Sequence, residues 1–304
     1  MKAIIAENLS KKYQEVQAIE NVSIDVNFGE IFGLIGPDGA GKTTIIRILT
    51  TLILADSGNA NVNTFDVVKD YQKIRKSVGY MPGKFSLYED LTVEENVKLF
   101  ASIFNSKFEE NYNLIKTIYS QIEPFKNRLA GQLSGGMKQK LALSCALIHK
   151  PKILFLDEPT TGVDAVSRKE FWEMLIDLKN QGLAILVSTP YMDEASLCDR
   201  VGLIQHGKIM QIDTPTKIVQ DFKHSIFGIE SNKVYTILEL LRTYQNTYSC
   251  YAFGDKIHYI DKRNKFDIMD IQNFLKGNKV ENFIILDNVK PTIEDCFMDL
   301  MRHQ

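Results

Sequence analysis

The sequence lacks the features that mark membrane-spanning, secreted and nucleic-acid-binding proteins. No apolar run approaches the roughly 18 residues that a transmembrane helix needs. The N-terminal stretch MKAIIAENLSKKYQE turns polar too soon for a signal peptide. The formal net charge is -2 over 304 residues, so the basic excess typical of nucleic-acid-binding proteins is missing. We therefore expect no nucleic-acid partner.

Cysteine and histidine are both scarce. The 4 cysteines are scattered without a Cys-x-x-Cys pair: Cys145, Cys198, Cys250 and Cys296. This spacing favours reduced thiols over metal ligands or disulfides. Three histidines stand isolated in residues 222–304: His224, His258 and His303. We expect structural or solvated roles for them.

Apolar runs of strand length alternate with helical patterns through residue 212. The runs EIFGLIG, KILFLDE and LAILVST are continuous and apolar, as in strands buried on both faces of a sheet. The helical stretch SRKEFWEMLIDLKNQG separates the last two runs. This pattern predicts an α/β domain over residues 1–221, with a mixed sheet and a helical subdomain at about 84–150.

Residues 222–304 have a different pattern of strand-like and helical segments. Strand-like and helical segments follow one another there in the order β-α-β-β-α-β, the ferredoxin-like pattern. A last helix is expected in PTIEDCFMDLMRH, after Pro291. We predict a small α+β domain that is regulatory or contributes to dimerisation, and we find no catalytic constellation in it.

The segment GPDGAGKTT matches the phosphate-loop pattern G-x-x-x-x-G-K-[ST] between a predicted strand and an apolar helix. Glycines let backbone N–H groups close around phosphates, and the helix N-terminus adds its dipole. Lys42 brings a charge to the outer phosphates, and the Thr43 hydroxyl can ligate Mg²⁺. The predicted nucleotide-binding residues of this segment are Gly36, Pro37, Asp38, Gly39, Ala40, Gly41, Lys42, Thr43 and Thr44.

Two acidic residues end the apolar strand in ILFLDEP. Asp157 is placed to hold Mg²⁺ together with Thr43, through water. Glu158 follows directly and can polarise an attacking water, so it is the predicted catalytic residue.

Between these motifs lies LSGGMKQK. Ser134 with Gly135 and Gly136 is expected to begin a helix whose N-terminus can face a γ-phosphate. With this segment the chain resembles, over about Ile4 to Asp213, the ATPase subunit of an ATP-binding cassette (ABC) transporter. The C-terminal segment with its PTIEDCFMDLM ending is similar, as a weaker match, to the tails of cassettes of drug-efflux type. The resemblance implies a P-loop NTPase cassette that binds ATP and Mg²⁺ and pairs head to tail with a second cassette. The residues implied to complete the partner's ATP site are Leu133, Ser134, Gly135, Gly136 and Met137.

The resemblance implies further roles. Tyr13 would stack on adenine, and Asp164 in TTGVDAVSR would touch the partner cassette. The stretch LYEDLTVEENVKLF would receive an integral-membrane permease. Such subunits are cytoplasmic, peripheral on the inner face of the cell membrane, and couple ATP hydrolysis to transport, here export.

Two positions depart from the family pattern although their flanks match it. Gly83 stands in GYMPGKF where similar cassettes have Gln, and Pro190 stands in VSTPYMDEA where they have His. Lys84 is a possible nearby donor. Thr189 or Ser188 is expected to cap a helix with Pro190 at its first position. We predict slow hydrolysis at the chain's own site, which favours a heterodimer over a homodimer.

Two other functions stay open. A binding-only regulatory cassette would close with ATP but show no turnover. A soluble ABC ATPase without a permease would act on DNA or ribosomes, which the acidic balance and the single cassette disfavour.

Overall fold

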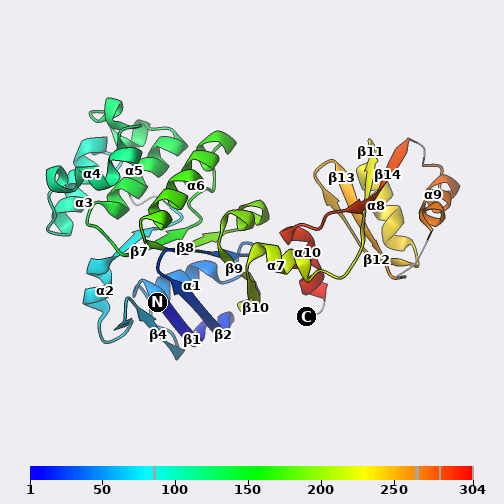
Figure 1. The fold of residues 1–304 in the computed structure, drawn as a ribbon, viewed down its shortest axis with the longest axis horizontal. Helices are drawn as coiled ribbons and strands as arrows, with labels where there is room; N and C mark the ends of the chain where they lie inside the picture. Colours follow the sequence, from blue (N-terminus) through cyan, green and yellow to red (C-terminus); the bar gives the residue numbers. More distant parts are fainter. Residues whose placement is uncertain (85–86, 264–266, 281, 303–304) are drawn as a thin grey trace. The chain divides into compact units, whose positions relative to one another are not determined.

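The computed structural model describes residues 1–84, 87–263, 267–280 and 282–302. It divides into two compact units, Met1–Pro215 and Thr216–Gln304 (Figure 1). The division falls slightly before residue 222, where the sequence pattern changes. The reason is that the short helix α7 (Pro215–Gln220) contacts the C-terminal helix α10 (Ile293–Arg302). The Cys296 thiol of α10 lies 3.6 Å from the Ile218 carbonyl oxygen of α7. His303 lies outside the described residues.

The first unit is built on a six-stranded sheet with the order β10-β9-β3-β8-β7-β6. All neighbouring strands are parallel except β10, which is antiparallel to β9, so the sheet is mixed as predicted. The three apolar runs form its fully buried centre. The strands are β3 (Ile31–Ile35), β6 (Val78–Met81), β7 (Ile153–Asp157), β8 (Ala184–Thr189), β9 (Arg200–Gln205) and β10 (Lys208–Asp213).

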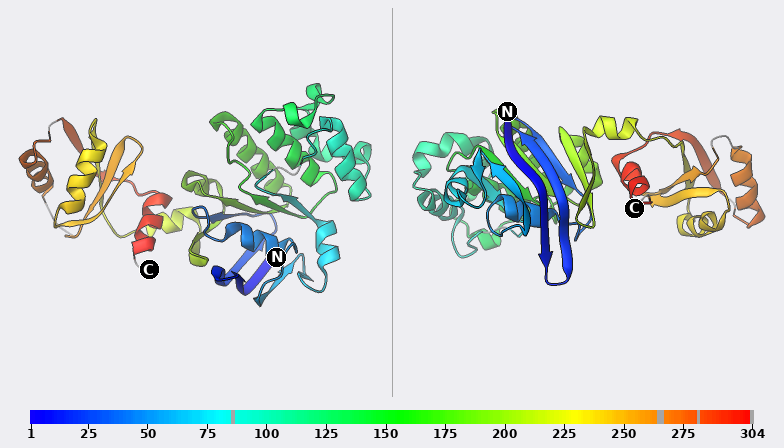
Figure 2. Two further views of the ribbon diagram at one scale, coloured as in Figure 1. Left: turned by 180° about the vertical axis from the view of Figure 1, so that it is seen from behind. Right: turned by 90° about the horizontal axis from the view of Figure 1, so that it is seen from below.

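A second, antiparallel sheet has the order β2-β1-β4-β5. Its longest pair forms the hairpin that runs past the body of the unit in Figure 2. Apolar side chains of this sheet, of helix α1 and of the six-stranded sheet share one core cluster. Helix α1 is therefore held in place by both sheets. These elements are β1 (Lys2–Tyr13), β2 (Val16–Asn27), β4 (Ser57–Val62), β5 (Phe65–Asp66) and α1 (Lys42–Leu49).

Helices α3, α4 and α5 pack together beside the sheets, in the region predicted to be a helical subdomain (Figure 1). Helix α3 begins with a capping box, in which Thr92 and Glu95 bond each other's backbone N–H groups. None of the helices in the described part of the chain has both the length and the apolarity that a membrane span requires. Besides α1, the helices of this unit include α2 (Tyr71–Ser77), α3 (Val93–Ile103), α4 (Phe108–Tyr119), α5 (Gly135–Leu147), α6 (Ala165–Asn180) and the 3₁₀ segments η1 (Glu123–Phe125), η2 (Ala130–Gln132) and η3 (Met192–Leu197).

The second unit has one antiparallel sheet with the order β12-β13-β11-β14. Helices α8 and α9 contribute apolar side chains to the core that covers it. Strands and helices alternate in the order that the sequence pattern indicates. The elements are β11 (Ile226–Ser231), α8 (Val234–Thr243), β12 (Thr247–Phe253), β13 (Lys256–Asp261), α9 (Ile268–Gly277), β14 (Phe283–Val289) and α10 (Ile293–Arg302).

A buried polar cluster joins α10 to the β12–β13 hairpin. The Asp295 carboxylate, 1% exposed, bonds the His258 Nδ1 atom at 2.7 Å and also accepts from the Tyr251 hydroxyl. Its other oxygen accepts from the backbone N–H and the hydroxyl of Thr292 at 2.7 and 2.6 Å. His258 is thus isolated in sequence but has a structural role, which is to partner a buried charge that would otherwise be costly.

We expect Asp295→Asn to lower the free energy of unfolding of the C-terminal unit by about 2–4 kcal/mol. The substitution replaces one of the two accepting oxygens by an amide donor, which faces either the Thr292 donors or His258 and Tyr251, and it removes the charge. Native-state hydrogen exchange at β12 and β13 measures the loss. Asp255→Asn, at an exposed carboxyl in the β12–β13 turn, is the control and should have little effect. Equal protection in the two variants would contradict the role of the cluster.

The Asp295 carboxylate also makes this stability pH-dependent. Burial raises the pKa of Asp295, but hydrogen bonds from His258, Thr292 and Tyr251 outweigh it and hold the pKa below its ordinary 3.8. A group with a lowered folded pKa contributes stability above its unfolded pKa and loses it as pH falls. The difference in protection between wild type and Asp295→Asn should therefore shrink as the pH falls below about 4.

Candidate active site

The predicted phosphate loop joins β3 to α1 at the carboxyl end of the sheet. The Gly36 N–H donates to the Thr189 carbonyl at 3.3 Å, and a Cβ at Gly36 would lie 2.1 Å from the Ile204 carbonyl oxygen. Gly39 and Gly41 have φ values of 76° and 104°, in the left-handed region that favours glycine. The path of the loop therefore requires these glycines, as the motif predicts.

Lys42 is the first residue of α1, directly after this loop, and its side chain is 2% exposed. Its ammonium group donates to the carbonyl oxygens of Gly36 and Pro37 at 2.7 and 2.9 Å. It also forms an ion pair with the Glu158 carboxylate at 3.2 Å. The structure thus brings the predicted phosphate-binding lysine and the predicted catalytic glutamate into direct contact, although they lie far apart in sequence.

The second acidic residue, Asp157, lies at the carboxyl end of β7 and is 4% exposed. Its Oδ1 atom accepts hydrogen bonds from the Thr43 hydroxyl at 3.1 Å and from the Ser188 hydroxyl at 2.7 Å. A carboxylate beside a hydroxyl is a set of hard oxygen ligands, the kind that Mg²⁺ prefers. The two residues predicted to hold the metal therefore lie together and fit it.

Ser188, expected from the sequence only as a helix cap, contacts the candidate site through its hydroxyl. Its side chain is fully buried at the end of β8, next to both acidic residues. The signal available in the sequence was a hydroxyl at the end of an apolar strand. That signal is weak, because a serine at a strand end is usually solvated or caps the next element.

Gly83 follows β6 and lies beside the acidic pair. A Cβ at this position would meet the Asp157 carbonyl oxygen at 3.1 Å and the Glu158 Cβ at 4.0 Å. A side chain here would begin next to the predicted catalytic residue.

Pro190 follows Thr189, whose carbonyl holds the phosphate loop at Gly36. The expected helix with Pro190 at its first position is wrong: the 3₁₀ segment η3 begins at Met192 with no side-chain cap. The reason is that both candidate caps are otherwise engaged. The Thr189 hydroxyl accepts from the Tyr191 N–H at 3.0 Å, and the Ser188 hydroxyl bonds Asp157.

The segment LSGGM (residues 133–137), called the signature segment below, leads into α5, as predicted. Ser134 caps the helix by accepting from the Met137 N–H at 3.3 Å. Ser134 and Gly135 are exposed, whereas Leu133 and Gly136 are buried. Their exposure leaves the start of this helix accessible to another molecule.

Helix α5 is tied to the loop that follows Glu158. The fully buried Gln139 donates from its amide nitrogen to the Pro159 carbonyl at 2.8 Å, a link that the sequence analysis missed. A Cβ at Gly136 would lie 2.5 Å from the Ser167 hydroxyl oxygen, so the first turns of α5 and α6 are in close contact.

Asp164 and Tyr13 occupy other positions near the surface. Asp164 caps α6 by accepting from the N–H groups of Val166 and Ser167 at 3.1 and 3.0 Å, and the bonds from Ser167 lower the pKa of its carboxyl. Tyr13 ends β1 with 42% of its surface exposed, and the Lys11 ammonium lies 5.9 Å from its ring centre. Both side chains are therefore accessible to a ligand or a partner.

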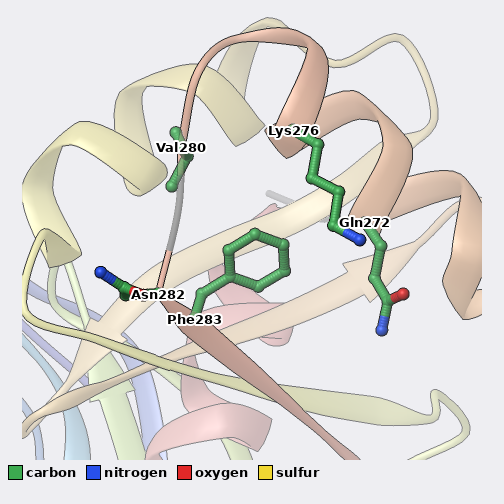
Figure 3. A pocket seen from close by; sticks show the side chains of 5 residues that line it. All are labelled: Gln272, Lys276, Val280, Asn282 and Phe283. Atoms are coloured by element: carbon green, nitrogen blue, oxygen red, sulfur yellow. The ribbon is translucent and has the colours of Figure 1, made fainter.

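The C-terminal unit carries a surface cavity of about 510 Å³ at the ends of α9 and β14 (Figure 3). It is lined by Gln272, Lys276, Val280, Asn282 and Phe283. These side chains supply one amine, two amides and an aromatic ring, which contain no acid–base or nucleophilic pair.

We expect Gly136→Ala to lower the free energy of unfolding of the first unit by about 1–3 kcal/mol, because its methyl group would overlap Ser167. Gly135→Ala is the matched control: its Cβ would meet the Gly162 carbonyl oxygen at an ordinary 3.5 Å, and alanine favours helix by about 1 kcal/mol. Urea unfolding followed by the fluorescence of Trp172 measures both variants. A Gly136→Ala protein as stable as Gly135→Ala would refute the close packing.

Comparison with known proteins agrees with this geometry. The family model for ABC transporters matches residues 19–161. The probable multidrug ABC transporter ATP-binding protein YbhF of Escherichia coli is 43% identical over 223 residues, which cover 72% of this chain but only 39% of YbhF. The linearmycin resistance ATP-binding protein LnrL of Bacillus subtilis is 34% identical over 217 residues, 70% of this chain and 70% of LnrL.

Solved structures give the same assignment. The ATP-binding subunit of an ABC transporter superposes with a TM-score of 0.66 at 27% identity, covering 72% of this chain and 93% of that chain. A dimeric ATP-binding cassette bound to ADP and Pi has a TM-score of 0.64 at 25% identity, covering 69% of this chain and 98% of that chain. The chain therefore belongs to the ABC transporter family, as an ATP-binding protein with the P-loop NTPase fold.

Proposed function

We propose that this chain is the ATPase subunit of an exporter and works with a separate integral-membrane permease. The names of its relatives support export: LnrL is a linearmycin resistance protein, and the DrrA protein of Mycobacterium tuberculosis, 35% identical over 222 residues, is a doxorubicin resistance protein. The proposal places the chain on the cytoplasmic face of the membrane.

In this proposal the phosphate loop binds the ATP phosphates through its N–H groups and Lys42. Thr43 and Asp157 would hold Mg²⁺, which would neutralise phosphate charge when bound. The outer phosphates would compete with the Glu158 carboxylate for the Lys42 ammonium, 3.2 Å away. Glu158 would then be released to accept a proton from water. Tyr13 would stack on the adenine ring.

A second cassette would complete the ATP site. The exposed start of α5 at Ser134 and Gly135 offers N–H groups and a helix dipole to a partner's γ-phosphate. Asp164 would lie at the same interface. We favour a heterodimer, in which this chain's intact signature segment serves a partner that has a fully equipped site.

The stretch LYEDLTVEENVKLF, residues 87–100, is proposed to receive the permease. It begins with a surface loop over residues 88–92. This loop is held by the fully buried Asn96, whose amide accepts from the Tyr88 N–H at 2.9 Å and donates to the carbonyls of Tyr88, Leu91 and Thr92 at 3.0, 3.2 and 2.9 Å. A loop fixed to the start of α3 in this way could transmit movement between cassette and permease.

The chain's own site is proposed to hydrolyse ATP slowly. The observation that carries this is the position of Gly83, where a side chain would begin 3.1 Å from the Asp157 carbonyl and 4.0 Å from the Glu158 Cβ. With glycine there and proline at 190, neither position supplies a side-chain donor to orient water. The retention of Glu158 favours slow hydrolysis over none.

Two other functions make different predictions. A binding-only regulatory cassette would dimerise with ATP and show no turnover even with its permease. A soluble ABC ATPase would turn over ATP without any membrane component. Assay of the chain with and without its permease separates the three.

We expect Gly83→Gln combined with Pro190→His to raise ATP turnover by about 10²-fold, the lower end of what a water-orienting group supplies. The glutamine requires the Asp157 carbonyl to shift by a few tenths of an ångström, because the Cβ distance is 3.1 Å. The assay is steady-state phosphate release by the purified chain. Adding Glu158→Gln should abolish the gain. Unchanged turnover in the double variant would contradict the impaired site.

A further inference from the structure

Ser188 connects both predicted acidic residues of the site through one hydroxyl. The group donates to the Asp157 carboxylate at 2.7 Å and accepts from the Glu158 N–H at 3.0 Å. The side chain is fully buried, so no water competes for these bonds. Both capacities of the hydroxyl, donor and acceptor, are used within the site.

The backbone of Glu158 has an unfavourable conformation that hydrogen bonds must stabilise. Its φ is 50°, in the left-handed region that a residue with a Cβ rarely adopts. Its N–H lies 3.0 Å from the Ser188 hydroxyl oxygen and 3.1 Å from the Ser188 carbonyl oxygen, so one residue of β8 supplies both acceptors. This conformation directs the Glu158 side chain to Lys42, with which it forms an ion pair.

The orientation of the Asp157 carboxylate also depends on Ser188. Its Oδ1 atom receives two hydroxyls, from Thr43 on α1 and from Ser188 on β8. If only Thr43 were present, the carboxylate would be fixed from one side. The hydroxyl of Ser188 adds a contact from the neighbouring strand, and the β7–β8 pairing of Asp157 with Ser188 fixes that contact.

We propose that Ser188 is a positioning residue that orients the Asp157 carboxylate for Mg²⁺ and holds the Glu158 backbone in its left-handed conformation. The inference rests on the proposed function, in which Asp157 holds the metal and Glu158 acts on water. The role of Ser188 is more important in this chain than it would be with side-chain donors at positions 83 and 190, because Gly83 and Pro190 supply none. Ser188 reaches the acidic pair from the same strand end that leads into Pro190.

The test compares Ser188→Ala with Ser144→Ala in the full-length chain. Both serines are fully buried, but the Ser144 hydroxyl bonds the Lys140 carbonyl within α5 at 2.9 Å. ATP affinity is measured by titration calorimetry in EDTA and in Mg²⁺, and turnover is measured at saturating ATP. Thermal unfolding of both variants shows whether they fold equally well.

We expect Ser188→Ala to lower turnover by about 10–100-fold and to weaken ATP binding in Mg²⁺, as loss of a residue that orients a metal ligand does. Affinity in EDTA should be unchanged, because Lys42 and the loop N–H groups remain. Ser144→Ala should match wild type in every nucleotide assay. Ser188→Thr keeps the hydroxyl and should recover most of the turnover.

The outcomes separate this inference from the function on which it rests. A wild-type chain that does not bind ATP with Mg²⁺ overturns both. Wild-type binding together with a Ser188→Ala protein of unchanged turnover and Mg²⁺ dependence overturns the role of Ser188 alone. Equal losses in EDTA and in Mg²⁺ would show a general structural defect and also overturn it.

Discussion

The parallel pairing of β3, β8 and β7 is the constraint on which the site depends. Parallel strands end at the same edge of a sheet, and ligands of α/β proteins bind beyond their carboxyl ends. Here that edge receives the phosphate loop from β3, the acidic pair from β7 and Ser188 from β8. The register Ile35↔Thr189 and Asp157↔Ser188 sets which side chains meet. A slip of one residue would turn Ser188 to the other face of the sheet.

Burial makes these polar groups depend on one another. Lys42 and Asp157 are almost fully enclosed, and an unpaired charge in such a place is strongly unfavourable. The loop carbonyls and Glu158 compensate Lys42, while Thr43 and Ser188 compensate Asp157. Each charged group therefore has hydrogen-bond or ion-pair partners within the site, and a phosphate would compete with Glu158 for Lys42.

The sequence was most informative where a motif has a backbone requirement. GPDGAGKTT specifies its loop because a Cβ at Gly36 would meet the Ile204 carbonyl and because Gly39 and Gly41 adopt positive φ. The continuous apolar runs predicted central strands for a different reason, because strands covered on both faces of a sheet are apolar throughout. It was least informative for hydroxyls and amides. Ser188, Gln139 and Asn96 are ordinary polar residues in the sequence, and their importance comes from burial and from partners far along the chain.

The sequence by itself determined the family and the phosphate-loop motif, and it predicted the acidic pair and the two departures at Gly83 and Pro190, because these are properties of residue type and spacing. Only the tertiary structure decided which groups the side chains at the end of β8, Ser188 and Thr189, bond. The sequence indicated a capped helix, but the Ser188 and Thr189 hydroxyls are engaged by the acidic pair and by the Tyr191 turn. The same holds for His258 and Asp295, 37 residues apart, which meet because α10 packs on the β12–β13 hairpin. Hydrogen bonds between distant segments follow from strand register and helix packing, which no local pattern encodes.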